Sequence, residues 1–221
     1  MAAEDKKQQL ETQLWNIANT LRGKMDADDF RDYILGFIFY KYLSEKMHHY
    51  ADSILKPDKI TYDQVEKPKD NTELLAAVKD EALDKLGYFL KPSELFSELA
   101  RRGNAEGKSK FILDDLSKVL TNIEQSTMGS ESEEDFGHLF EDLDLTSSKL
   151  GKTENDKNEL IVKVLTHLNE IDFDIHNTET DILGDAYEYL IGKFASGAGK
   201  KAGEFYTPQQ VSSVLAQLVT I

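Results

Sequence analysis

Near its carboxyl end the chain carries a short corner of residues suited to binding a small anionic ligand, Gly203-Glu-Phe-Tyr-Thr-Pro208. Thr207 is a residue type that caps helices, and Pro208 fits the first helical position, where its missing N–H has no partner to lose. Gln210, three residues after Thr207, completes a capping box. The unpaired N–H groups and the positive dipole end of such a helix can hold a carboxylate or a phosphate. The aromatic pair of the corner would add flat apolar surface beside it.

A purely structural role explains the same residues. Thr207 can cap its helix while Phe205 and Tyr206 pack in a core, since capping boxes are common and ligand sites are few. Both alternatives stay open on spacing alone. Apolar residues then recur at helical spacing and predict one buried helix face, made of Val211, Val214, Leu215, Leu218 and Val219.

A Gly/Lys-rich stretch precedes the corner. Its Gly197-Ala-Gly199 is the one Gly-x-Gly of the sequence, and it follows a helix expected to end near Phe194. A nucleotide-binding glycine turn follows a strand instead, so we interpret residues 197–203 as a hinge. Lys200 and Lys201 in this hinge are candidate DNA phosphate contacts.

The end of the chain resembles a known family. Asp181 to Val219 is similar to the segment that leads into the methyltransferase domain of the modification (M) subunit of type I restriction-modification systems. In that family a Gly-Asp-x-Tyr-Glu-Tyr-Leu helix precedes Phe-Ala, a Gly/Lys loop and Gly-x-Phe-Tyr-Thr-Pro. Here the matching residues are Gly184 to Leu190, Phe194-Ala195 and Gly203 to Pro208. Upstream segments are similar to the family's N-terminal helical domain: Asp29 to Lys46, Tyr88 to Phe96, Phe140 to Asp144, Leu150-Gly151 and Leu168 to Phe173.

The resemblance implies a function. The complete M subunit of this family transfers a methyl group from S-adenosylmethionine to adenine N6, after the base is flipped out of the duplex. It works in the cytoplasm of bacteria or archaea with a specificity subunit, a second M subunit, a restriction subunit and double-stranded DNA. The residues that the resemblance assigns to the cofactor are Glu204, Phe205, Tyr206, Thr207, Pro208 and Gln209.

Two motifs that such enzymes need are missing, a glycine-rich turn after a strand and Asn/Asp-Pro-Pro-aromatic. The four prolines are never adjacent, at Pro57, Pro68, Pro92 and Pro208. No serine stands in a nucleophile-elbow context either. We therefore expect no catalytic residue in this chain and expect the catalytic core to lie on sequence beyond it. A non-catalytic helical module that binds a protein or clamps DNA remains the alternative.

Charge and composition limit the functions that the chain can have. The 221 residues carry a net charge of −15, whereas DNA-binding proteins usually present a basic surface, so we expect weak DNA binding by this chain alone. The absence of cysteine fits a cytoplasmic protein. No run of eighteen apolar residues occurs, so we expect no membrane span.

Charged residues gather in two places. The loop after residue 100 holds Arg101, Arg102, Lys108 and Lys110, which either contact DNA phosphates or merely complement a helix dipole. Residues 130–144 hold seven acids and no Lys or Arg, with an apolar stripe of Phe136, Leu139, Phe140 and Leu143. These acids face either a basic partner or solvent.

No metal site is expected. His48 and His49 are adjacent on an expected helix, so they point about 100° apart. His138 and Asp142 have i, i+4 spacing but no third ligand in evident reach, and the remaining histidines are isolated.

Helical periodicity dominates the rest of the chain. Stripes such as Leu10, Leu14 and Ile17 predict about eight helices, with at most a strand pair in the whole fold. Residues 60–65 are expected to form one short turn or a strand. The helix expected after Asp26 is apolar on nearly all sides, which favours central burial over contact with another molecule. Further helices are expected to begin at Pro92, at Ser109 and at Asn155 or Asp156. We predict a mainly α fold, with a helical N-terminal domain (1–178) and an arm (179–221) that leads toward a Rossmann-like methyltransferase core.

Overall fold

The computed structural model describes residues 3–21, 27–66, 71–105, 110–173, 184–186, 188–190 and 209–219. These residues form helices joined by turns and contain no strand, which confirms the mainly α prediction. No helix among them is long and apolar enough to cross a membrane. The helices and 3-10 turns are α1 (Ala3–Leu21), α2 (Ala27–Leu55), η1 (Lys56–Asp58), α3 (Tyr62–Val65), α4 (Thr72–Lys85), η3 (Pro92–Glu94), α5 (Phe96–Gly103), α6 (Leu113–Ser126), α7 (Glu133–Phe136), α8 (Glu154–Asn169) and α10 (Gln209–Val219).

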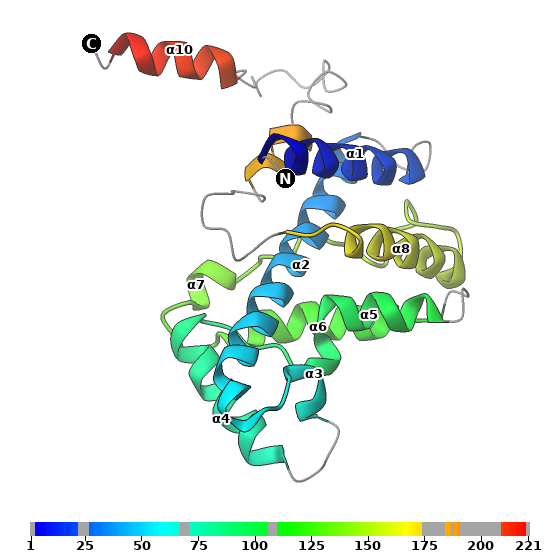
Figure 1. Ribbon diagram of the computed structural model, residues 1–221. Helices are drawn as coiled ribbons and strands as arrows, with labels where there is room; N and C mark the ends of the chain where they lie inside the picture. The colour runs from blue at the N-terminus through cyan, green and yellow to red at the C-terminus, as the bar shows by residue number, and fades with distance from the viewer. Residues whose placement is uncertain are drawn as a thin grey trace.

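Helix α2 runs through the middle of the body, and the other helices except α10 are arranged around it (Figure 1). It contacts α4, α5 and α8, while α8 also lies against α1 and α5. The predicted central burial is confirmed, because α2 has buried side chains on several sides, among them Tyr33, Ile34, Phe37, Ile38, Tyr40, Leu43 and Met47. The stripe of α1 is buried too, at Leu10, Leu14 and Ile17.

Buried tyrosines tie the connecting segments to this central helix. The hydroxyl of Tyr40 donates to the carbonyl of Glu94 (2.6 Å), and that of Tyr88 donates to the carbonyl of Leu43 (2.8 Å). Tyr33 likewise donates to the carbonyl of Asp144. Burial raises the pKa of Tyr40 and of Tyr88, so both hydroxyls stay protonated and keep donating at neutral pH.

Residues 60–65 were expected to form one short turn or a strand, and residues 62–65 form the short helix α3. Three expected helix starts are wrong. The helix expected from Pro92 begins at Phe96, because Leu95 is extended (φ −66°, ψ 144°) after the separate turn η3. Its first N–H is satisfied from α2, where the buried Ser44 hydroxyl accepts from the Phe96 N–H at 2.7 Å.

The two other corrections concern helix starts. Helix α6 begins at Leu113, with Ile112 at the N-cap position, whereas the expected cap Ser109 lies outside the described residues. Helix α8 is capped by Thr153, not by Asn155 or Asp156. The Thr153 hydroxyl accepts from the Asp156 N–H (3.1 Å), and the Asp156 carboxylate accepts from the Thr153 N–H (3.1 Å). This reciprocal pair is a capping box, which satisfies two N–H groups at once.

Candidate functional site

Most of the expected cofactor corner lies outside the described residues. This applies to Glu204, Phe205, Tyr206, Thr207 and Pro208, and also to Lys200 and Lys201 of the expected hinge. Gln209 is described as the first residue of α10, so the helix expected to follow Pro208 is confirmed.

The apolar face of α10, which was predicted to be buried, is exposed to solvent in this structure. The helix stands apart from the helical body in Figure 1. Its five stripe residues are between 47% and 82% exposed: Val211, Val214, Leu215, Leu218 and Val219. The helix carries no charged residue. A contiguous apolar face of this kind is typical of a surface that another part of a protein covers.

The basic loop is described in part. Arg101 and Arg102 both lie in the last turn of α5, and each faces an acid. Arg101 makes a bidentate pair with Glu98 through Nε (2.9 Å) and Nη2 (2.6 Å). Arg102 Nη1 lies 2.8 Å from the Asp115 carboxylate of α6. The guanidinium groups therefore join α5 to itself and to α6.

Lys110 lies across the loop from these arginines, and Lys108 is outside the described residues. The Lys110 side chain is exposed, while its backbone is fixed. Its carbonyl accepts from Nδ2 of the buried Asn158 (2.7 Å), and Oδ1 of the same side chain accepts from the Ile112 N–H (2.8 Å). One buried amide thus holds the segment that enters α6.

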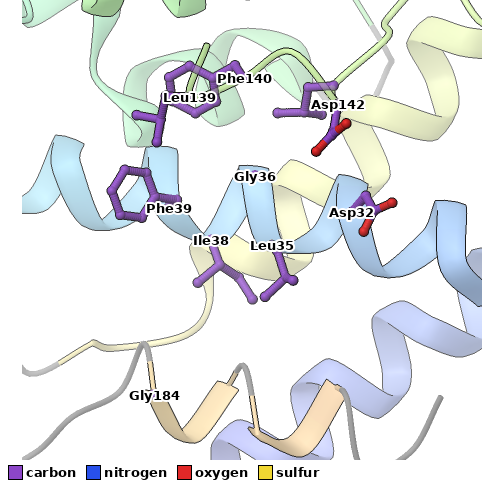
Figure 2. Close-up of a pocket in the computed structure, with 10 residues that line it drawn as sticks. Asp32, Leu35, Gly36, Ile38, Phe39, Leu139, Phe140, Asp142 and Gly184 are labelled. Carbon is purple, nitrogen blue, oxygen red and sulfur yellow. The ribbon is translucent and has the colours of Figure 1, made fainter. Parts of the chain in front are cut away.

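A groove that was not predicted lies between α2 and the turns after α7. Its volume is about 550 Å³. Figure 2 shows Phe39 of α2 on the side of Leu139 and Phe140, whereas Leu35 and Ile38 project from α2 toward the segment that carries Gly184. Asp32 and Asp142 stand at one end, and Gly184 also lines the groove. The sequence showed the apolar stripe of residues 136–143. Its spacing did not indicate that part of the stripe lines a groove open to solvent.

Chain geometry forms this groove. Gly137 is extended (φ −62°, ψ 128°) and His138 is left-handed (φ 66°), so the single turn of α7 stops and the stripe folds back toward α2. Gly36 permits the approach, because a Cβ built on it would lie 2.8 Å from the Leu143 Cγ. Phe140 and Leu143 are buried, while Leu139 stays half-buried at the groove wall.

Metal binding has no support from the described part of the chain, in which no three His, Asp or Glu side chains are placed to share an ion. His48 lies 3.5 Å from Asp52 and 3.6 Å from Asp63, while His138 lies 3.4 Å from Glu141. These contacts join pairs of side chains across helix turns and loops.

Two family models match successive parts of the sequence. The model of the HsdM N-terminal domain matches residues 10–168, and that of the N-6 DNA methylase matches residues 178–221. The chain is 34% identical over 212 residues to the type I restriction enzyme MpnII methylase subunit of Mycoplasma pneumoniae, covering 95% of this chain and 39% of that one. It is 23% identical to the type I restriction enzyme MjaIX methylase subunit of Methanocaldococcus jannaschii, covering 96% of this chain and 36% of the relative.

A solved structure agrees with these sequence matches. The crystal structure of the type I restriction-modification system methyltransferase subunit from Streptococcus thermophilus superimposes with a TM-score of 0.75 at 37% identity. The match covers 97% of this chain and 44% of that one. The chain therefore spans about two fifths of the length of the relatives and the structure that it matches.

Proposed function

Because this chain belongs to the family of HsdM N-terminal domains, we propose that it works as the N-terminal part of a type I DNA methyltransferase subunit, which transfers a methyl group from S-adenosylmethionine to adenine N6. The observation that carries the proposal is the order of the two matches. A helical domain over residues 10–168 is followed, in one chain, by the first part of an N-6 DNA methylase match at residues 178–221.

The exposed face of α10 supports the same proposal. An uncharged helix with five exposed apolar residues is suited to being covered by a larger core. Helix α10 lies wholly inside the N-6 DNA methylase match. In the proposed subunit, the methyltransferase core covers this face.

The two parts of the chain have different roles in this proposal. Residues 1–178 form the helical domain, which docks on partner subunits and closes on DNA. Residues 179–221 form the arm, in which Glu204 to Gln209 contact S-adenosylmethionine. Phe205 and Tyr206 pack against the donor, and Thr207 with the start of α10 holds its polar end. No residue of this chain is catalytic in the proposal.

The proposed DNA contacts are Lys200, Lys201, Arg101, Arg102, Lys108 and Lys110. Arg101 and Arg102 would have to exchange Glu98 and Asp115 for phosphate. Such an exchange is feasible because solvent-exposed ion pairs contribute at most about 1 kcal/mol. Lys110 is exposed and needs no such exchange.

The proposed assembly contains a specificity subunit, a second copy of the methylase subunit, a restriction subunit and double-stranded DNA, in the cytoplasm. The net charge of −15 fits this arrangement. An acidic chain gains DNA affinity from basic partners more readily than from its own surface.

Calorimetric titration of the full-length protein with S-adenosylmethionine tests the cofactor corner. We expect Tyr206→Ala to weaken donor binding by about tenfold, equivalent to about 1.4 kcal/mol of lost stacking and packing. Phe111→Ala is the matched control, because Phe111 is an aromatic residue of the helical body that is 49% exposed. It should leave the affinity unchanged.

Two outcomes would overturn the assignment of this corner. One is a folded full-length protein that binds no S-adenosylmethionine. The other is a Tyr206→Ala protein that binds the donor as the unmodified protein does. The 221-residue chain alone should bind the donor weakly, since one wall of a pocket leaves most of the ligand in solvent.

A further inference from the structure

The groove between α2 and residues 139–143 has no role in the proposed methyl transfer. Its lining is mostly apolar: Phe39 of α2 lies on the side of Leu139, and Leu35, one helical turn before Phe39, also lines the groove (Figure 2). All three side chains are half-buried, so each keeps apolar surface in contact with solvent. A volume of about 550 Å³ can take one or two large side chains of a binding partner.

The groove ends in negative charge. The carboxylates of Asp32 and Asp142 lie at the same end in Figure 2, away from Phe39 and Leu139. Asp142 is exposed and makes no ion pair with any described residue. An apolar slot beside carboxylates is complementary to an apolar side chain that is followed closely by a Lys or Arg.

The negative charge extends well beyond the slot. Residues 130–144 contain seven acids and no Lys or Arg, and Glu134 and Asp135 are exposed and make no ion pair within the described part of the chain. Asp144 stays ionised over a wide pH range, because hydrogen bonds from the Thr146 hydroxyl and N–H lower its pKa. The negative electrostatic potential of these acids repels nucleic acid and attracts an extended basic surface.

We propose that this groove is the docking site of a basic amphipathic helix from a protein partner. Apolar side chains one turn apart on that helix enter between Phe39 and Leu139, and its Lys or Arg residues reach Asp142, Asp32 and the acids of residues 131–135. Helix-in-groove binding of this kind combines apolar anchors with a charged rim. The extent of the acidic surface favours a helix over a small organic cation, which would use only the slot.

The groove is lined by residues of both matched regions of the chain. Its lining includes Gly184, which belongs to the N-6 DNA methylase match, as well as residues of the HsdM N-terminal match. A bound helix would therefore contact both matched regions at once and bias their relative placement.

Fluorescence anisotropy with two labelled synthetic peptides tests the proposal on the full-length protein. Both peptides have about eighteen residues, or five helical turns, of the same Leu, Lys and Ala composition. One gathers its leucines into a single stripe, and the other scatters them around the helix. We expect the striped peptide to bind at least about tenfold more tightly. Its binding should slow hydrogen exchange at residues 32–39 and 139–143.

Charge-reversal variants separate docking from general attraction between opposite charges. Asp142→Lys should weaken binding of the striped peptide by about fivefold or more. Asp80→Lys makes the same charge change at an exposed site of α4 and should have less than about a twofold effect. Leu139→Gln should also weaken binding, with a thermal melt to show that the variant is folded. If the Leu139→Gln variant is unfolded, hydrogen exchange of the unmodified protein with and without the striped peptide still shows whether the peptide binds in the groove.

Several results would overturn the proposal. Equal binding of the two peptides, or equal losses in the two charge variants, would leave only non-specific attraction. Phenethylammonium binding as tightly as the striped peptide would identify a small-cation site. A dimer detected by sedimentation, with the same segments protected and no peptide binding, would show that a second copy covers the groove. None of these readouts depends on methyl transfer, so the proposed function and the docking site can fail separately.

Discussion

The ammonium nitrogen of Lys41 lies 4.8 Å from the centre of the Phe173 ring, and Lys41 is only 3% exposed. The same nitrogen lies 5.7 Å from the ring of Phe96 and pairs with the carboxylate of Glu45. Burial raises the pKa of Glu45, and the positive charge of Lys41 opposes that shift. Phe173 is the last described residue before the segment that leads to the arm. Lys41 thus fastens the end of the helical body to α2.

Removing this cation should destabilise the helical body. We expect Lys41→Ala to lower the free energy of unfolding by about 2–4 kcal/mol, because it leaves Glu45 partly buried without its partner and removes the contacts with both rings. Urea unfolding of the 221-residue chain measures this. Lys118→Ala, at an exposed site of α6, should change stability by less than about 0.5 kcal/mol. Equal effects of the two substitutions would refute the role given to Lys41.

Gly36 should resist substitution although it lies inside a helix. Helix propensity alone favours alanine over glycine by about 1 kcal/mol. A Cβ at this position, however, would lie 2.8 Å from the Leu143 Cγ, so the turn that carries Leu143 must move. We expect Gly36→Ala to destabilise the protein by about 1–3 kcal/mol in urea unfolding. In the background of Leu143→Ala the same substitution should be neutral or stabilising. A gain of stability in the unmodified background would contradict the close packing.

Asp144 should make stability depend on pH in the acidic range. Hydrogen bonds from the Thr146 hydroxyl (2.6 Å) and N–H (2.9 Å) lower the pKa of this carboxyl below its ordinary value. A lowered folded pKa stabilises the protein above the unfolded pKa, and this contribution is lost as pH falls through the folded pKa. Asp144→Asn should therefore cost at most about 0.5 kcal/mol at pH 7, because charge-assisted bonds become neutral ones and solvent screens the charge of this exposed carboxylate. The difference should disappear as pH falls through the lowered folded pKa of Asp144.

Chemical denaturation from pH 2 to pH 7 measures that difference. Asp142→Asn is the control, since its carboxylate accepts no hydrogen bond from the described residues. It should leave the pH profile nearly unchanged. A constant stability difference between Asp144→Asn and the unmodified protein at all pH values would rule out the proposed hydrogen-bond effect.

A substitution on the apolar face of α10 should affect the stability of the 221-residue chain and of the proposed full-length subunit differently. Leu215 is 54% exposed, so Leu215→Ala should change the stability of the 221-residue chain by less than about 0.5 kcal/mol. In the full-length protein, where we propose that the methyltransferase core covers this face, the same substitution should cost about 2–5 kcal/mol. Thermal melts of the four proteins give the comparison. A neutral effect in both chains would show that the apolar face stays uncovered.

Helical periodicity predicted the helices that are buried on one face, such as α1, and the helix that is buried on nearly all sides, α2. The stripes of α1 and α2 could be found from sequence because Leu10, Leu14 and Phe37 recur at the spacing that places them on buried faces. Gly87 follows the end of α4 with a φ of 81°, a conformation that favours glycine after a helix. Capping was predictable in principle for α8, since Thr153 and Asp156 have capping-box spacing.

Tertiary contacts decided the remaining features. The start of α6 depends on Asn158, a residue 46 positions away from Ile112 in sequence. The start of α5 likewise depends on Ser44. The groove arises because His138 adopts a left-handed conformation and Gly36 lets Leu143 approach α2. Neither feature is indicated by the residues next to it in the sequence. The expected cofactor corner stays a prediction, since residues 204–208 lie outside the described part of the chain.

The most direct test of the account is the product of the reaction. The proposed full-length subunit, assembled with the proposed specificity subunit, would be incubated with double-stranded DNA and S-adenosylmethionine. The DNA would then be digested to nucleosides for mass spectrometry. We predict that N6-methyladenine appears, and that its rate of formation falls in Tyr206→Ala and not in Phe111→Ala. An assembled complex that binds the donor yet forms no methylated base, or methylates cytosine alone, would contradict the account.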